Sequence, residues 1–128
     1  MATRLIYKIS PRAAWDAAVS AGSFTGAPID VADGFIHFST AEQVAETAAK
    51  HFRGQANLIL IAIDAGALGA DLKWEPSRGG ALFPHLYAPL DVSHARQVFD
   101  LPLDADGVPV IPADLASHAS QGGLEKPC

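Results

Sequence analysis

Helical periodicity is confined to the first half of this 128-residue chain, and this asymmetry constrains the fold more than any other feature. Apolar residues recur at helical spacing in residues 11–21 and 40–53, and no such repeat follows residue 54. A doubly wound parallel sheet would keep alternating strands and helices to its end. Strand-like apolar runs occupy residues 4–10, 35–39, 57–64, 72–75 and 95–101. The order predicts an α+β fold: a small, curved, mostly antiparallel, split β-structure with two helices against it.

Both predicted helices carry sequence signals at their starts. Ser10 is a good N-cap, and Pro11 suits the first helical position of residues 11–21. Gly22 would end this helix in a left-handed conformation. Ser39 and Glu42 form an S-x-x-E capping box for residues 40–53.

The remaining segments are assigned by their turn-forming residues and their apolar content. Residues 57–64 show no alternation and read as a strand buried on both faces. Residues 23–34 and 76–83 are rich in Gly and Pro and read as loops, and residues 65–71 read as a turn. Prolines at both ends of the segment predict that any strand in residues 84–90 is short or at an edge. Asp106-Gly107 predicts a turn after which residues 108–111 could pair back.

The length suits a single domain, which we place at residues 1–112, ahead of a flexible tail at residues 113–128. Asp and Glu (14) outnumber Lys and Arg (9), and the net charge of −5 argues against duplex nucleic acid as a partner. One cysteine, Cys128, offers neither an intramolecular disulfide nor a cysteine metal cluster. The longest apolar run, residues 58–63, is far shorter than the ~20 residues of a membrane helix. We therefore expect a soluble, cytoplasmic protein with no membrane partner.

The first candidate motif is GFIHFST, residues 34–40, in which a strand runs directly into a helix. His37 and Ser39 project from the same face of that strand. Ser39 and Thr40 lie at the helix N-terminus, where free N–H groups favour an anion or a carbonyl. The pattern fits a site where His37 and the hydroxyls bind a polar small molecule. It also fits a Ser39 that only caps the helix and a His37 that hydrogen-bonds a loop carbonyl.

The second motif is WEPSRGG, residues 74–80. Glu75 ends a strand beside a glycine-bearing loop, a common place for a general base or for an acceptor of ribose hydroxyls. Arg78 could hold a phosphate, because a guanidinium matches phosphate oxygens bidentately. Alternatively, Glu75 is a surface carboxylate paired with Lys73 or Arg78, and Arg78 is an ordinary surface charge.

The third motif is FPHLYAP, residues 83–89. In an extended segment His85 and Tyr87 share a face, where they could stack on an aromatic ligand and hydrogen-bond its edge. An edge strand whose aromatic residue packs in the core would give the same pattern. His37, His85 and Glu75 could in principle form a three-ligand metal site, but their spacing matches no tight metal motif, so we predict none.

The three motifs, with IYKI (residues 6–9) and Trp15, resemble the bacterial domain-of-unknown-function family 952 over about residues 4–112. That resemblance implies a fold similar to the ADP-ribosyltransferase fold, a split, curved β-structure around a cleft for a nicotinamide dinucleotide. By position it implies that His37 contacts ribose or adenosine and that Glu75 is the catalytic carboxylate. It also implies that Ser39, Thr40 and Tyr87 surround nicotinamide. Glu75 precedes Tyr87 here, whereas the usual order is His, Tyr, Glu.

We therefore expect a small-molecule ligand, with NAD as a candidate ligand or substrate, in a cleft lined by His37, Ser39, Glu75, His85 and Tyr87. In the catalytic interpretation, an enzyme acts on an ADP-ribose or nucleotide-type ligand, with Glu75 and His37 as the catalytic residues. In the alternative, a non-catalytic module senses a metabolite or nucleotide with the same cleft. A metal-assisted hydrolase and a protein-interaction domain are the remaining alternatives.

Overall fold

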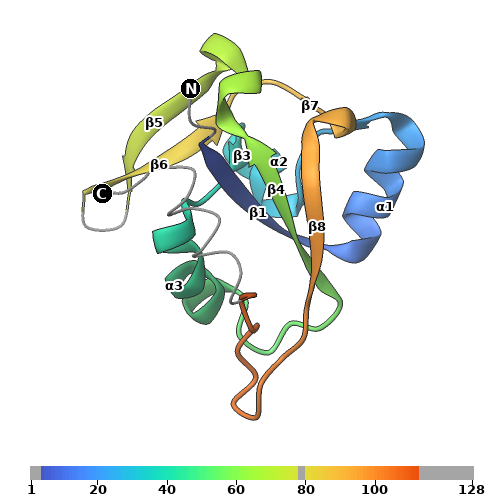
Figure 1. Cartoon of the computed structure of the whole chain (residues 1–128), viewed down its shortest axis with the longest axis vertical. Helices are drawn as coiled ribbons and strands as arrows, with labels where there is room; N and C mark the ends of the chain where they lie inside the picture. Colours follow the sequence, from blue (N-terminus) through green and yellow to red (C-terminus); the bar gives the residue numbers. More distant parts are fainter. Residues whose placement is uncertain (1–3, 78–79, 113–128) are drawn as a thin grey trace.

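The computed structural model of the chain describes residues 4–77 and 80–112 (Figure 1). Within these ranges the chain forms the α-helices α1 (Arg12–Ala21), α2 (Pro28–Asp33) and α3 (Ala41–His51). All strand pairs are antiparallel. The α+β prediction is confirmed, and the prediction of two helices is corrected to three, because α2 forms within residues 23–34.

The main sheet has the order β1-β4-β8. β4 (Leu58–Asp64) lies between β1 (Leu5–Pro11) and β8 (Ala95–Leu101), and Figure 1 shows this sheet between α1 and α3. All β4 residues except Asp64 are buried, as the apolar run predicted. The isoleucines of β4 pack in the core cluster that includes α1, and its leucines pack in the cluster that includes α3.

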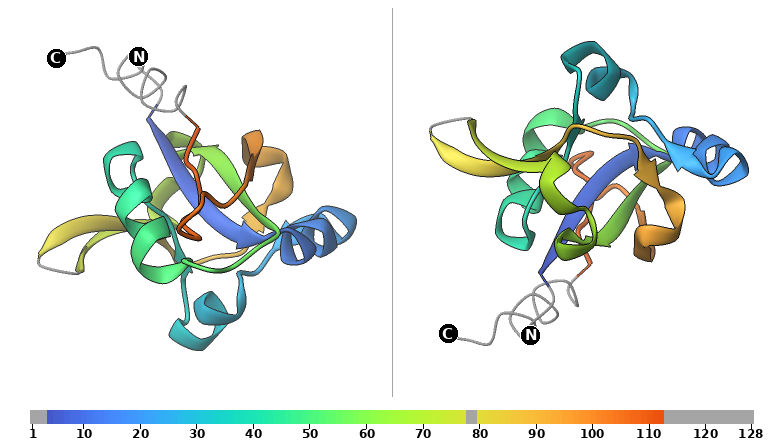
Figure 2. Two further views of the ribbon diagram at one scale, coloured as in Figure 1. Left: turned by 90° about the horizontal axis from the view of Figure 1, so that it is seen from below. Right: turned by 90° about the horizontal axis from the view of Figure 1, so that it is seen from above.

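The second sheet has the order β3-β6-β5 and carries the three sequence motifs. It consists of β3 (Ile36–His37), β6 (Ala81–Leu86) and β5 (Leu72–Ser77). Figure 2 shows the β5–β6 hairpin extending away from the body of the protein past α3. The expected loop at residues 76–83 is therefore partly wrong, since β5 continues to Ser77 and β6 begins at Ala81, while residues 78–79 lie outside the described residues. β6 is the central strand rather than an edge strand, because it pairs with both β3 and β5. Pro84 is tolerated there although it has no N–H, since its carbonyl accepts a hydrogen bond from the Phe38 N–H.

The segment after β3 joins the two sheets. Tyr7 and Ser39 form an isolated antiparallel bridge with both backbone hydrogen bonds at 2.8 Å. A third, two-stranded sheet pairs β2 (Ser23–Phe24) with β7 (Leu90–Asp91). The predicted loop at residues 23–34 is thus partly wrong. Pro28 at the first position of α2 and Gly34 in the left-handed conformation (φ 87°) bound the short helix.

Both helix starts lie one residue later than predicted. α1 begins at Arg12 and has no side-chain cap, because Ser10 is buried and its hydroxyl donates to the Pro11 carbonyl. At α3, Thr40 and Gln43 form the capping box instead of Ser39 and Glu42. Ser39 is held in the bridge to β1, so the next residue is the first one free to cap the helix.

The C-terminal part of the described chain follows the predictions. Residues 65–71 form two short 3-10 turns, and residues 108–111 pair back through the Leu103–Pro109 bridge. Cys128 and the expected flexible tail at 113–128 lie outside the described residues. Of the helices in the described ranges, none is long and apolar enough to cross a membrane.

Candidate functional site

His37 and His85 are opposite each other in the register of β3 and β6. Their ring centroids lie 5.5 Å apart and their planes meet at 72°. The Phe35 ring lies against both, with its centroid 4.6 Å from His37 and 4.3 Å from His85, and it lies 5.1 Å from Tyr87. The first and third motifs therefore meet in one group of rings, which we call the ring cluster (Phe35, His37, His85 and Tyr87).

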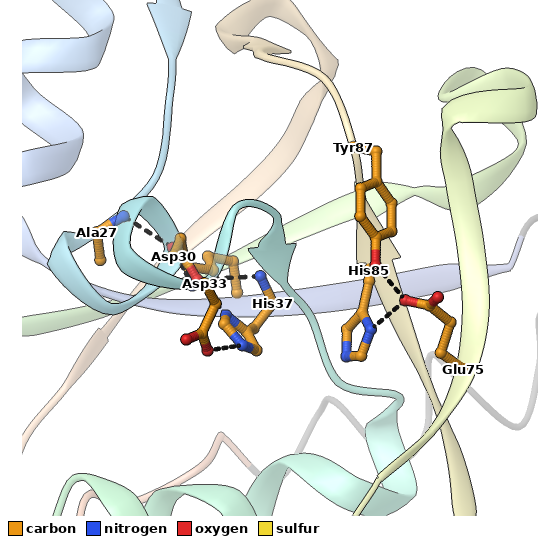
Figure 3. A network of polar contacts seen from close by, with 8 residues as sticks. Ala27, Asp30, Asp33, His37, Glu75, His85 and Tyr87 are labelled. Atoms are coloured by element: carbon orange, nitrogen blue, oxygen red, sulfur yellow. Dashed lines mark hydrogen bonds and ion pairs between the residues drawn. The ribbon is translucent and has the colours of Figure 1, made fainter.

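Glu75 of the second motif joins the ring cluster from β5. Its Oε1 lies 2.8 Å from His85 Nδ1 and 2.7 Å from the Tyr87 hydroxyl (Figure 3). Hydrogen bonds from His85 and from Tyr87 lower the pKa of Glu75. The bond between Tyr87 and Glu75 also raises the pKa of Tyr87. Both bonds end on Oε1, and no hydrogen bond from the described residues reaches Oε2. One carboxylate oxygen is therefore fixed while the other remains an acceptor.

Asp30, on α2, is the buried charge behind the ring cluster. One of its oxygens, Oδ1, lies 2.6 Å from His37 Nδ1 and accepts from the His37 N–H at 3.0 Å. The other, Oδ2, accepts from the Ala27 N–H at 2.7 Å and lies 2.6 Å from Lys8 Nζ. Burial raises the pKa of Asp30, but the hydrogen bonds from His37 and the charge of Lys8 outweigh it and lower the pKa to about 2. Burial lowers the pKa of Lys8, and the attraction of Asp30 only partly opposes this.

Residue 26, in the turn before α2, must be a glycine for Asp30 to reach this position. Gly26 has a φ of 117°, and a Cβ at this residue would lie 2.6 Å from the Asp30 Cβ. At the other end of α2, Asp33 Oδ2 lies 2.9 Å from His37 Nε2 (Figure 3). The sequence GAPIDVADGFIH thus folds so that both acids of α2 contact the same imidazole.

A pocket of about 380 Å³ adjoins the ring cluster on the α2 side. Phe35 and Tyr87 belong to both, and Asp30 forms part of the pocket wall. The rest of the lining is mostly apolar and comes from α2, β3 and the connection after β6: Val31, Gly34, Ile36, Leu86, Ala88 and Pro89, with Thr25.

Ser39 and Thr40, predicted to bind a ligand, lie outside the ring cluster. The Ser39 hydroxyl donates to Thr47 Oγ1 at 3.3 Å, and the Thr40 hydroxyl caps α3 by accepting from the Gln43 N–H at 3.3 Å. In return, Gln43 Oε1 accepts from the Thr40 N–H at 3.0 Å. The capping box therefore uses the N–H groups of Thr40 and Gln43, which the expected anion site at this helix N-terminus would have needed.

Two other predictions concern Arg78 and metal. Arg78, expected to hold a phosphate, lies outside the described residues. Within the ranges that the structure describes, no group of three or more His, Cys, Asp or Glu residues is arranged to hold a metal ion.

Sequence reasoning missed Lys8, Asp30 and Phe35. Lys8 stands between Tyr7 and Ile9 in an otherwise apolar strand, and that break in the pattern was the available signal. Asp30 lies in a segment assigned as a loop, and Phe35 was considered only as part of a strand.

Comparison with known protein families identifies the chain. The family described as Protein of unknown function (DUF952) matches residues 9–98. The chain belongs to this family. The DUF952 match includes all of the ring cluster, Glu75 and both acids of α2. No curated protein gave a significant match.

Solved structures similar to this DUF952 chain come from Caulobacter crescentus. The crystal structure of protein CC0527 is 63% identical, with a TM-score of 0.85, and the match covers 88% of this chain and 98% of that one. The solution NMR structure of CC0527 is 66% identical over 82% of this chain and 90% of that one, with a TM-score of 0.74. The chain is therefore similar to CC0527 in both sequence and fold.

Proposed function

We propose that this DUF952 protein binds a nucleotide-type ligand, such as NAD or ADP-ribose, at Glu75 and the ring cluster. The fixed carboxylate of Glu75 carries the proposal. His85 and Tyr87 both donate to Oε1, so that Oε2 is an ionised acceptor beside several rings. A carboxylate oxygen in this setting suits the hydroxyl groups of a ribose.

The rings and the adjoining pocket support the same ligand class. Tyr87 is 42% exposed, and Phe35 is half-buried beside it. An aromatic ligand ring stacked on such side chains gains about 0.5–1.5 kcal/mol beyond the area it buries. The pocket volume of about 380 Å³ lies within the usual range for small-molecule sites.

The proposed roles follow from these positions. Glu75 orients the ribose and stabilises an oxocarbenium-like centre, Tyr87 stacks on a ring, and His37 contacts a ribose oxygen. The resemblance to the ADP-ribosyltransferase fold supports these roles by analogy. Ser39 and Thr40 are left out, because their hydroxyls are engaged within the protein.

The second candidate is a non-catalytic module that senses the same type of ligand. It is favoured by the internal bonding of the imidazoles, since both ring nitrogens of His37 and Nδ1 of His85 already contact carboxylates. For either candidate we propose the cytoplasm as the place of action, in keeping with a sequence that has one cysteine.

The proposal is tested by measuring the melting temperature with NAD, ADP-ribose and nicotinamide, followed by calorimetric titration. A ligand at 100 times its Kd adds about 2.7 kcal/mol to the free energy of unfolding. Wild type and Glu42→Gln, which changes an exposed carboxylate on α3, should bind alike. Tyr87→Ala should bind more weakly, because it removes a stacking surface and a donor to Glu75.

Chromatography of NAD incubated with the protein separates the two candidates. An enzyme releases nicotinamide and loses this activity in Glu75→Gln, whereas a sensing module binds the ligand and leaves NAD intact. If none of these compounds stabilises the wild-type protein at millimolar concentration, the proposed ligand class is wrong.

A further inference from the structure

His37 is held at both ring nitrogens by the two acids of α2, but these acids differ in kind. The Asp30 side chain is fully buried and lies 2.6 Å from Nδ1. The Asp33 side chain is 44% exposed and lies 2.9 Å from Nε2. One side of the imidazole therefore faces a buried carboxylate, and the other faces a carboxylate that water also reaches.

The Asp30 contact is fixed from behind by Lys8. Lys8, on β1, is 3% exposed and lies 2.6 Å from Asp30 Oδ2, while the other oxygen faces His37. An ionised carboxylate can only accept, so Nδ1 of His37 carries a hydrogen and donates it. Two backbone N–H groups complete the bonds to Asp30, and the whole chain of contacts from Lys8 to Nδ1 is oriented by buried structure.

The contact between Asp33 and His37 is weak enough for another acceptor to replace Asp33. Nε2 attracts the Asp33 carboxylate only while it carries a hydrogen, and exposed ion pairs contribute about 0–1 kcal/mol to stability. Asp33 is the last residue of α2, and the two residues that follow it, Gly34 and Phe35, line the pocket. A ligand oxygen that enters beside Phe35 would therefore reach Nε2 by replacing a weak partner.

We propose that Lys8 and Asp30 are positioning residues that direct Nε2 of His37 toward the ligand, and that Asp33 occupies Nε2 in the free protein as an internal competitor. The competing ligand group is an acceptor oxygen, such as that of a phosphate, a carboxylate or a hydroxyl. This inference rests on the proposed function, because it assigns a regulatory contact to the same site.

The first experiment measures the affinity for ADP-ribose. Asp33→Ala is expected to bind about two- to five-fold more tightly than wild type, since it removes a surface ion pair that competes for Nε2. The matched control Asp16→Ala, which removes an exposed acid from α1, should bind as wild type does. Equal or weaker binding by Asp33→Ala would overturn the competitor role.

The second experiment needs no ligand and separates this inference from the proposed function. Nitrogen-15 NMR of the histidine rings reports the hydrogen-bond state of Nδ1 and Nε2 individually. Asp33→Ala should change the Nε2 signal of His37 and leave its Nδ1 signal in place. Lys8→Met should change the Nδ1 signal, and Lys8→Arg should restore it in part.

Each result of the NMR experiment decides something, even if ADP-ribose does not bind. If Lys8→Met folds and keeps the wild-type Nδ1 signal, the positioning role is wrong. If Lys8→Met does not fold, Asp33→Ala still tests the division of roles, because loss of both His37 signals would mean that Asp33 supports the ring rather than competes for it.

Discussion

Replacement of Asp30 by Asn removes the charge that ties β1, α2 and β3 together. The pKa of Asp30 falls from an ordinary 3.8 to about 2. One pKa unit corresponds to about 1.4 kcal/mol, so ionised Asp30 contributes about 2 kcal/mol to the free energy of unfolding near neutral pH. That is a large share of the roughly 5–15 kcal/mol that stabilises a typical domain.

The sign follows from the lowered pKa. The contribution is fully present above the pKa of the unfolded chain, and it is lost as the pH falls toward 2 and the folded carboxyl takes up its proton. Asp30→Asn has no group to titrate at this position. Its free energy of unfolding should therefore fall short of the wild-type value by most at pH 6, and this deficit should shrink by about two-thirds by pH 2.5.

Urea denaturation followed by tryptophan fluorescence measures this deficit at pH 6, 4, 3 and 2.5. Asp16→Asn is the control, because Asp16 is exposed on α1 and should differ from wild type by no more than about 0.5 kcal/mol at every pH. A deficit for Asp30→Asn that stays constant between pH 6 and pH 2.5 would refute the argument, since it would show that the carboxylate charge contributes no net stability.

Two further predictions concern the tyrosines and the α3 cap. The chain has two tyrosines, and a spectrophotometric titration should show Tyr7 ionising at about 12, because burial and the charge of a nearby glutamate raise its pKa. Glu75→Gln should lower the midpoint of Tyr87 alone, because its bond to Glu75 is what chiefly raises that pKa; an unchanged midpoint would contradict the contact. In thermal unfolding, Thr40→Asp should have a stability near that of wild type, since Asp also caps helices. Ser39→Asp should be destabilised by at least about 1 kcal/mol, since it buries a carboxylate. The reverse order of stability would mean that Ser39 is the cap.

The elements that the sequence predicted well are those with enough residues to show a period. The helices at residues 11–21 and 40–53 and the strands at 57–64 and 95–101 were each placed to within about two residues. β2 and β7 have two residues each, too few for a pattern. The strand predicted at residues 35–39 does form, but only the two residues of β3 pair as a strand. Such strands exist because a partner segment from elsewhere in the chain supplies their hydrogen bonds, which a local reading does not contain.

The candidate site was predictable to the extent that its residues share a sheet. His37, Glu75 and His85 were chosen as polar residues in apolar strands, and the order β3-β6-β5 brings all three together. Ser39 was grouped with His37 because the two alternate along one strand. That strand leaves its partner β6 after Phe38 and pairs with β1 at Ser39, so the grouping does not extend that far.

Lys8 shows that alternation of polar and apolar residues along a strand does not always mean that the polar residues are exposed. In residues 4–9, Arg4, Ile6 and Lys8 alternate with Leu5, Tyr7 and Ile9, and a half-exposed strand would turn the first set toward water. Ile6 and Lys8 are instead as buried as Tyr7 and Ile9, because core clusters cover both faces of the main sheet. A lysine in such a strand has to meet a carboxylate, since an unpaired buried charge is too costly to keep. Its partner is carried by a short helix in a segment rich in Gly and Pro, so the pair became visible only once the fold brought β1 and α2 together.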